Sequence, residues 1–314
     1  MINPPPKPER TLVLGSRGSD LALTQSRWVM GQLQTAWPEA KFELRIIKTE
    51  GDVDQTTRLD AFPTWGVFVK ELQIALLDKR IDFAVHSLKD VPDEKPEGLV
   101  LAAFPPREDA RDVLISQGPR FRELPAGSRV GTGSPRRVMQ LRAMRPDLEY
   151  VPLRGNVDTR IRKVRDGEMA AVLLAAAGLK RLNRHAEATH SFGFHEMIPA
   201  IGQAALALEC REEDAEVRHI LAAINDALTA DLIGLERRFM SAVGGGCKVP
   251  MAAHAYPSGD GFRFLCTMGR ADRADLVRLE RSLDFEDAEE EIDSLAAELL
   301  EECLAKGIPI PARP

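Results

Sequence analysis

Four short segments of this chain combine glycine, hydroxyl and basic residues in the way that anion-binding turns do. They are Gly15-Ser-Arg-Gly-Ser19, Ser87-Leu-Lys-Asp90, Gly131-Thr-Gly-Ser-Pro-Arg-Arg137 and Arg154-Gly-Asn156. Each follows an apolar run that predicts a β-strand, and ligands of open α/β sheets bind at the carboxyl ends of parallel strands. Helix N-termini favour anions there, and guanidinium groups bind carboxylates with two hydrogen bonds. A single arginine is more often an exposed surface residue, but four converging turns favour a site for a carboxylate-bearing ligand.

The charge distribution indicates the same kind of ligand. Residues 129–165 contain ten Arg and Lys against three Asp and Glu, whereas the whole chain has a net charge of −6. A local arginine excess in an acidic protein favours a confined anionic ligand, although a solvated helix face would give the same count. Aromatic residues make up only 5% of the chain, which weighs against a nucleic-acid binder.

Two further residues have side chains suited to catalysis. Asp90 stands at a predicted strand end beside Lys89, where it could act as a general acid or base, or simply as a helix cap or ion-pair partner. Cys247 follows three glycines, and such a loop lets a thiolate approach a ligand closely; a small buried turn cysteine is the alternative. The other cysteines, Cys210, Cys266 and Cys303, lie in apolar patterns typical of packed thiols.

The elements that must position these residues alternate between strand and helix. Strands are predicted over 11–15, 42–48 and 81–86, with helices over 21–33 and 67–80, which favours an α/β sheet. A second such unit starts after the proline-rich hinge 104–106, and a strand is expected over 202–210. From 227 onwards two helices flank three strands, which indicates a small α+β domain. The long loop 50–66 is expected to be a functional lid.

Composition excludes several classes of protein. The chain of 314 residues is 44% hydrophobic and 29% charged, as in soluble globular proteins. No apolar stretch approaches the ~18–20 residues of a membrane span, and no signal-peptide core is visible, so we expect a cytoplasmic protein. Neither paired cysteines nor histidine spacings typical of metal sites occur.

Four motifs together resemble the hydroxymethylbilane synthase family, also called porphobilinogen deaminases. They are Val85-His-Ser-Leu-Lys-Asp-Val-Pro92, Leu153-Arg-Gly-Asn-Val-Asp-Thr-Arg160, Ala175-Ala-Ala-Gly-Leu-Lys-Arg181 and Gly245-Gly-Cys-Lys-Val-Pro250. The resemblance runs in order from Leu12 to the last predicted helix. It implies a transferase that adds four porphobilinogen units to a dipyrromethane cofactor, with loss of ammonia at each addition. Water then releases the linear tetrapyrrole hydroxymethylbilane.

The resemblance also implies roles for individual residues. Cys247 would hold dipyrromethane by a thioether, and Asp90 would be the catalytic residue that assists loss of ammonia and stabilises positive charge. Cofactor-binding positions are implied at Lys89, Asp90, Thr132, Ser134, Arg136, Arg137, Arg154 and Arg160. Substrate-binding positions are implied at Arg17, Ser19, Gln25, Arg154, Arg160, Arg181 and Gln203. Because each pyrrole carries two carboxylates, the growing oligopyrrole is a polyanion that needs a dense arginine field. We therefore expect Arg136, Arg137, Arg154 and Arg160 to face the ligand cleft, and Arg142 and Arg145 to be solvated.

The implied fold has two periplasmic-binding-protein-like α/β lobes with mixed, mainly parallel sheets and a small α+β C-terminal domain. Lobe 1 would comprise 10–104 and 199–222, lobe 2 would be 105–198, and the C-terminal domain with the cysteine loop would be 223–314. The family further suggests a monomer with no nucleic-acid or membrane partner.

Several positions depart from the family pattern. Pro63, Thr64 and Trp65 stand where a Gly-Gly-Lys stretch is usual, and Glu50 replaces a basic residue. The expected lid has therefore lost positive charge and gained the Trp65 indole, which could stack on a pyrrole or merely fill space. Gly133 and Ala204 replace a more usual Ser and Gly. A non-catalytic two-lobe anion-binding protein is the rival interpretation, but it would need neither Cys247 nor Asp90.

Overall fold

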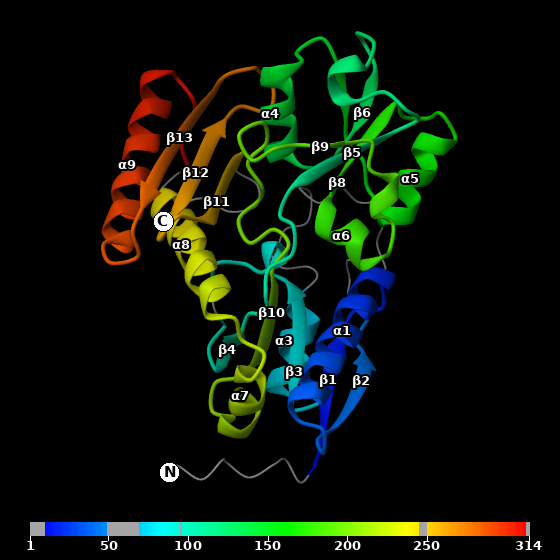
Figure 1. Ribbon diagram of the computed structural model, residues 1–314, viewed down its shortest axis with the longest axis vertical. Coiled ribbons are helices and arrows are strands. Elements are labelled where there is room, and N and C mark those ends of the chain that lie inside the picture. Colours follow the sequence, from blue (N-terminus) through cyan, green and yellow to red (C-terminus); the bar gives the residue numbers. More distant parts are fainter. Residues whose placement is uncertain (1–9, 49–68, 95, 245–249, 312–314) are drawn as a thin grey trace. The chain divides into compact units, whose positions relative to one another are not determined.

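The computed structural model describes residues 10–48, 69–94, 96–244 and 250–311 (Figure 1). Within these ranges the chain forms two compact units. Among the described residues, unit 1 comprises 10–48, 69–94, 96–107 and 205–230, and unit 2 comprises 108–204, 231–244 and 250–311. The N-terminal tail, the expected lid over 50–66 and Cys247 lie outside the described residues. No helix among the described residues has the length and apolar character needed to span a membrane.

Unit 1 is built on a five-stranded mixed sheet of order β2-β1-β3-β10-β4. Its strands are β1 Thr11–Ser16, β2 Lys41–Ile46, β3 Phe83–Ser87, β4 Leu99–Ala103 and β10 Leu206–Arg211. Its helices are α1 Asp20–Ala36, α3 Lys70–Leu77, α7 Ala215–Ala222 and the 3₁₀ turn η2 Leu88–Asp90. One apolar cluster includes residues of α1 and α7, such as Val29 and Val217, and another includes Leu72 and Leu76 of α3. The sheet therefore has a hydrophobic core on each face.

Unit 2 contains a second five-stranded sheet, of order β7-β6-β8-β5-β9. Its strands are β5 Asp112–Ser116, β6 Arg129–Gly131, β7 Glu149–Val151, β8 Ala171–Ala175 and β9 His190–Ser191. Its helices are α4 Pro135–Met144, α5 Val157–Arg165, α6 Ala176–Arg181 and the 3₁₀ turns η3 Phe121–Glu123 and η4 His185–Glu187. Apolar residues alternate along β5 and β8 between two clusters, so this sheet is also buried on both faces.

The C-terminal part of unit 2 is an antiparallel sheet of order β11-β12-β13. Its elements are β11 Met251–Ser258, β12 Gly261–Gly269, β13 Leu276–Leu283, α8 Ala227–Val243 and α9 Ala288–Ala305. A large apolar cluster unites the sheet with both helices, through residues such as Phe239, Phe264 and Leu299. Gly307, with φ of 66°, follows the end of α9, where a left-handed residue is the usual stop.

The expected α/β class with a small α+β C-terminal domain is confirmed. The sheets are less parallel than expected, because each described five-stranded sheet has two parallel and two antiparallel strand pairs. The antiparallel pairs arise where β10 inserts between β3 and β4, and where β5 inserts between β8 and β9. The three-domain boundaries stay a prediction.

The predicted first residue of one strand is wrong. We expected a strand from residue 202, but β10 begins at Leu206. Gly202 and Ala204 have φ of 66° and 71°, and this left-handed backbone is incompatible with an extended strand. Residues 201–204 form a turn instead.

Candidate active site

Unit 1 brings two of the predicted turns together because β1 and β3 are parallel neighbours. Half-buried Arg17 follows β1, and Ser19 caps α1 by accepting the Ala22 N–H at 3.4 Å. Half-buried Lys89 and exposed Asp90 follow β3. The sequence order strand, turn, helix therefore places these polar groups at one edge of the sheet.

The Asp90 turn is held by several hydrogen bonds. The Leu88 N–H donates to the Ala205 carbonyl at 3.0 Å, and the Val91 N–H donates to the Leu88 carbonyl at 2.9 Å. Buried Gln25 exchanges hydrogen bonds of 3.1 and 3.3 Å with the Ser87 hydroxyl. With Leu88 fully buried as an anchor, the Asp90 carboxylate is presented to solvent from a fixed backbone.

Gln25 was expected to bind substrate, but it is only 4% exposed. Its amide fixes the end of β3, so in this structure it supports the Asp90 turn. On the opposite side of the same strand, His86 Nε2 lies 2.9 Å from Glu209 Oε2, and Gln73 donates to Glu209 Oε1 at 3.0 Å. Buried polar pairs therefore brace the strand that carries Asp90.

Unit 2 gathers most of the predicted basic residues, and a buried aspartate organises two of them. Asp112, the first residue of β5, is 0% exposed and accepts hydrogen bonds from Arg136 at 2.7 Å and Arg137 at 2.6 Å. Gln203 donates to the same carboxylate at 3.2 Å. Burial alone would raise the pKa of Asp112, but the two guanidinium charges hold this pKa well below its ordinary value.

Arg160 lies among like charges. Its Nε donates to the Gly155 carbonyl at 2.9 Å. Burial, together with the charges of Arg137 and Arg154, lowers the pKa of Arg160 to about 10. A cation that is buried beside other cations gains most from a bound anion, since the anion restores the missing counter-charge.

The backbone around Arg160 requires glycine. Gly155 has φ of +108°, and a Cβ there would lie 2.8 Å from Thr159 Cγ2. Asn156 caps α5 by accepting the Thr159 N–H at 2.9 Å. This tight turn fixes the start of the helix and with it the position of Arg160.

The remaining predicted residues of unit 2 lie at the start of α4 and at the end of α6. Thr132 is buried and accepts the Ser134 N–H at 3.2 Å, while Ser134 caps α4 by accepting the Arg137 N–H at 3.4 Å. Arg181 donates to the Ala204 carbonyl at 2.7 Å. Burial lowers the pKa of Arg181 to about 10, and the nearby Glu108 only partly offsets this effect.

Comparison with known proteins identifies the family to which this chain belongs. The family model "porphobilinogen deaminase, dipyromethane cofactor binding domain" matches residues 12–219, and the model of the C-terminal domain of the same family matches residues 231–301. This chain belongs to the porphobilinogen deaminase family. Its activity is the transferase activity of that family, hydroxymethylbilane synthase, and its cofactor is dipyrromethane.

Individual relatives match most of this chain. A porphobilinogen deaminase of Syntrophus aciditrophicus is 45% identical over 295 residues, covering 94% of this chain and 95% of the relative. One of Sorangium cellulosum is 46% identical over 297 residues, covering 94% and 99%. Among solved structures, the periplasmic VFT2 domain of Bordetella pertussis BvgS is 15% identical, with a TM-score of 0.42 over 72% of this chain and 92% of that one. That last likeness carries no further conclusion.

The structure differs from the sequence prediction in which arginines of this porphobilinogen deaminase are buried. Arg136 and Arg137 were expected to face a cleft, but each is 6% exposed and bound to Asp112. A buried carboxylate needs its counter-charges, and this requirement draws both guanidinium groups into the interior. Asp112 was missed as a functional residue; its signal was an acidic residue opening an otherwise apolar strand.

Arg142 and Arg145 were expected to be solvated, which is wrong. Arg145 donates to the carbonyls of Phe121, Arg122 and Leu124, and its side chain is 18% exposed. The Arg142 guanidinium lies 5.2 Å from the Tyr150 ring centroid, and its Nε donates to the Ala271 carbonyl at 3.1 Å. Both side chains therefore tie loops to α4 instead of pointing into water.

The three described thiols are poor candidates for cofactor attachment. Cys210, Cys266 and Cys303 are all buried. Burial raises the pKa of Cys210 to about 12 and that of Cys303 to about 11, and it raises the pKa of Cys266 still further. Since the thiolate is the nucleophile, these side chains are unreactive at neutral pH.

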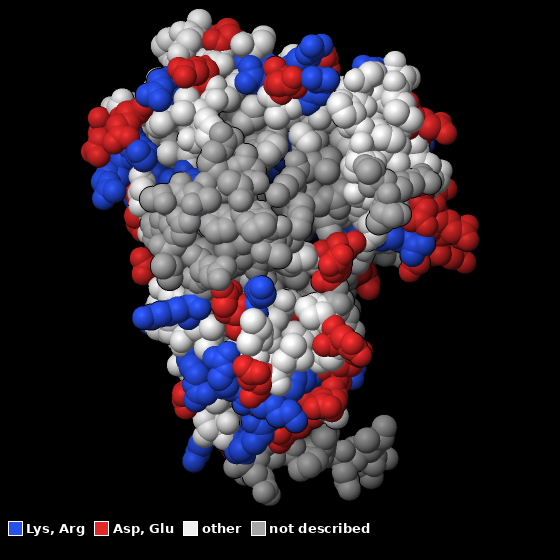
Figure 2. All heavy atoms as spheres, turned by 180° about the vertical axis from the view of Figure 1, so that it is seen from behind, with Lys and Arg blue, Asp and Glu red and all other residues white. Residues whose placement is uncertain are grey.

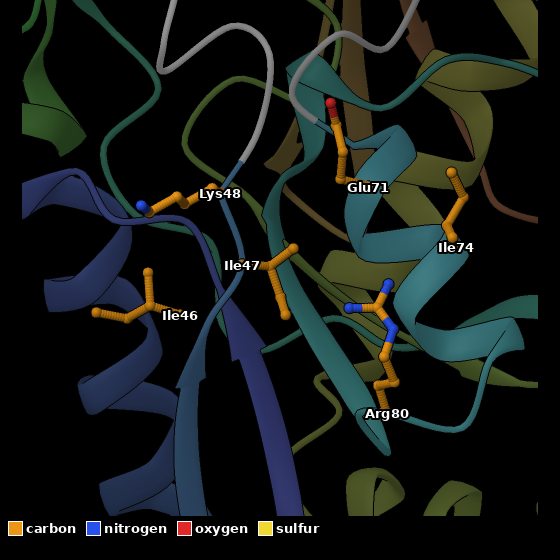
Figure 3. A pocket seen from close by; sticks show the side chains of 6 residues that line it. All are labelled: Ile46, Ile47, Lys48, Glu71, Ile74 and Arg80. Atoms are coloured by element: carbon orange, nitrogen blue, oxygen red, sulfur yellow. The ribbon is translucent and has the colours of Figure 1, made fainter.

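The surface adds two observations. Acidic and basic side chains are interspersed over the described atoms of the face shown in Figure 2. A cavity of about 270 Å³ in unit 1 is lined by Ile46, Ile47, Lys48, Glu71, Ile74 and Arg80 (Figure 3). None of the predicted site residues lines this cavity, and we assign it no ligand.

Replacing Arg160 tests whether its side chain binds the ligand or contributes only to the overall charge of the protein. We expect Arg160→Gln to lower turnover roughly 10- to 100-fold, because a charged hydrogen bond contributes ~1.5–3 kcal/mol. Enzyme-bound intermediates should accumulate, as intact mass spectrometry would show. Arg162→Gln on the exposed face of the same helix is the matched control and should leave turnover nearly unchanged. Equal effects of the two variants would show that Arg160 acts only through overall charge.

Proposed function

We propose that this chain condenses four porphobilinogen units in sequence and releases hydroxymethylbilane and ammonia, with Asp90 as its catalytic residue. The observation that carries the proposal is the cluster of Arg137, Arg154 and Arg160, in which burial and then the charges of the two neighbouring arginines lower the pKa of Arg160. Such a cluster suits a ligand that carries many carboxylates, as an oligopyrrole does.

The same arginine cluster is suited to binding the carboxylates of the dipyrromethane cofactor. Dipyrromethane, when bound, supplies the primer to which the substrate units are joined. Its carboxylates would be held by Arg154 and Arg160 and, at the start of α4, by Thr132 and Ser134. Arg136 and Arg137 would act partly through Asp112, since that carboxylate already holds them. Arg17, Ser19 and Lys89 in unit 1 and Arg181 and Gln203 in unit 2 complete the proposed set.

Asp90 is suited to the proton transfers of this reaction. Ammonia leaves an aminomethyl group only after that nitrogen is protonated, and the carbon left behind carries positive charge. A carboxylic acid can give the proton, and the resulting carboxylate can stabilise the positive charge. The hydrogen-bonded backbone of η2 fixes the point from which the Asp90 side chain extends.

We further propose that Cys247 is the attachment point of the cofactor and that the protein acts as a cytoplasmic monomer. Cys247 lies outside the described residues. The buried, high-pKa environments of the three other thiols support Cys247 as the reactive one. Light scattering of the purified protein would measure its oligomeric state.

Intact mass measurement tests the proposal directly. We expect the purified chain to carry a covalent adduct of dipyrromethane size, and Cys247→Ala to carry none and to be inactive. Cys210→Ala is the control, because its thiol is buried in unit 1 and should not affect the adduct. Peptide mapping that placed the adduct on Cys210, Cys266 or Cys303 would refute the proposed attachment.

A further inference from the structure

The turn at residues 202–204 holds two parts of the arginine-rich site. Gln203 donates to the Ala110 carbonyl at 2.7 Å and to Asp112 at 3.2 Å. The next carbonyl, that of Ala204, accepts a hydrogen bond from Arg181 at 2.7 Å. Asp112 in turn binds Arg136 and Arg137. The turn therefore contacts Arg181 directly, and it contacts the other two arginines through Asp112.

This turn has a backbone that must be held by its surroundings. Ala204 has φ of 71°, a left-handed conformation that is costly for a residue with a Cβ. Such conformations persist where neighbouring groups over-determine them, and they concentrate at functional sites. Gly202, at φ of 66°, precedes it and is the residue through which the turn is tethered.

The tether is Glu236 of α8, whose side chain is 0% exposed. Its Oε2 accepts the Gly202 N–H at 2.7 Å. Its Oε1 accepts the Ala255 N–H of β11 at 2.9 Å and lies 3.0 Å from His254 Nδ1. One buried carboxylate thus joins α8, β11 and the turn that positions the arginines.

The two secondary-structure elements that Glu236 joins also bracket the cysteine segment. Helix α8 ends at Val243 and β11 begins at Met251, with residues 245–249 between them. We propose that Glu236 is a positioning residue for cofactor attachment, because it holds α8 and β11 in a fixed place relative to the Gln203–Asp112 arginine cluster. This inference rests on the proposed attachment at Cys247, and all the contacts that carry it lie within unit 2.

The variant Glu236→Gln breaks the tether selectively. An amide has one oxygen instead of two, and two donors, Ala255 N–H and His254 Nδ1, converge on the Oε1 position. The amide oxygen should stay there, which turns the NH₂ group towards the Gly202 N–H. Two donors then face each other, so the link to residues 202–204 is lost while the link to β11 remains.

The assay measures how fast the cofactor becomes covalently attached to the chain. The chain is produced in cells that cannot make porphobilinogen, porphobilinogen is then added, and intact mass reports the rate at which the adduct forms. Hydrogen exchange at the Gly202 amide reports whether the tether is broken. We expect Glu236→Gln to exchange faster at Gly202 and to form the adduct at least ~10-fold more slowly than the unmodified chain, since small misplacements of reacting groups are costly.

The matched control is Thr267→Val. Thr267 is also 0% exposed, lies in the same C-terminal sheet and donates to the Val277 carbonyl at 2.6 Å, away from residues 202–204. It should lower the melting temperature but leave the attachment rate unchanged. Glu236→Asp, which keeps the charge but is one methylene shorter, takes the place of Glu236→Gln if the latter does not fold.

Normal adduct formation in a folded Glu236 variant with fast Gly202 exchange would overturn the inference. An equal slowing in Thr267→Val would also overturn it, because the effect would then follow stability alone. Failure of the proposed function gives a different result: the unmodified chain would gain no adduct, or Cys247→Ala would gain one.

Discussion

Asp90→Asn should give a folded protein that still binds porphobilinogen but turns over at least ~10²-fold more slowly. Asparagine keeps the shape of the side chain and removes its charge and its transferable proton, and loss of a general acid or base costs about this much. The turn should survive, because its hydrogen bonds come from Leu88, Val91 and Ser87 and not from the Asp90 side chain. Initial rates of hydroxymethylbilane formation measure the effect.

Glu94→Gln is the control for Asp90. Glu94 is an exposed carboxylate four residues further along the same segment, and its loss should leave turnover nearly unchanged. Intact mass should show pyrrole units bound to the Asp90→Asn chain, which separates slow chemistry from failed binding. Near-normal turnover in Asp90→Asn would show that Asp90 is only a structural residue of the turn and not the catalytic residue.

Asp112→Asn should destabilise unit 2 by ~3–5 kcal/mol at neutral pH, the usual cost of removing one partner from a buried ion pair. Arg136 and Arg137 would be left buried beside each other without their counter-charge. Urea unfolding followed by circular dichroism measures the loss. Cofactor attachment should also weaken, since Gln203 and both arginines lose their common partner.

The effect of Asp112→Asn should depend on pH in a defined direction. The pKa of Asp112 is lowered in the folded chain, so its ion pairs stabilise the fold above the unfolded-state pKa of about 4. This contribution is lost as the pH falls towards the folded-state pKa. The difference between the unmodified chain and Asp112→Asn should be complete at pH 7 and shrink in acid. Asp272→Asn, which removes an exposed partner of Arg270, should show little difference at either pH.

The turns that carry the proposed site residues could be predicted from the sequence because they form by local rules. Ser87 to Asp90 follows an apolar strand, and the structure places η2 directly after β3. Asn156 after Gly155 predicts a helix start, and the structure shows that cap and a left-handed glycine. Strand ends, caps and glycine turns depend on neighbours within a few residues, so the amino-acid order carries the information.

The sequence by itself therefore determined the family and the α/β class, and it supplied the side chains that we propose for catalysis and ligand binding. It did not determine which arginines are held inside, since Arg136 and Arg137 depend on Asp112, more than twenty residues away. Nor did it show that Arg142 and Arg145 are half-buried, because Tyr150, Ala271 and the 121–124 carbonyls lie beside them only in the folded chain. The contacts of Glu236 with Gly202 and Ala255, which lie on separate segments, could not be read from the sequence either. Burial and pairing set the charge balance of a site, and both arise from contacts between distant residues that only the tertiary structure creates.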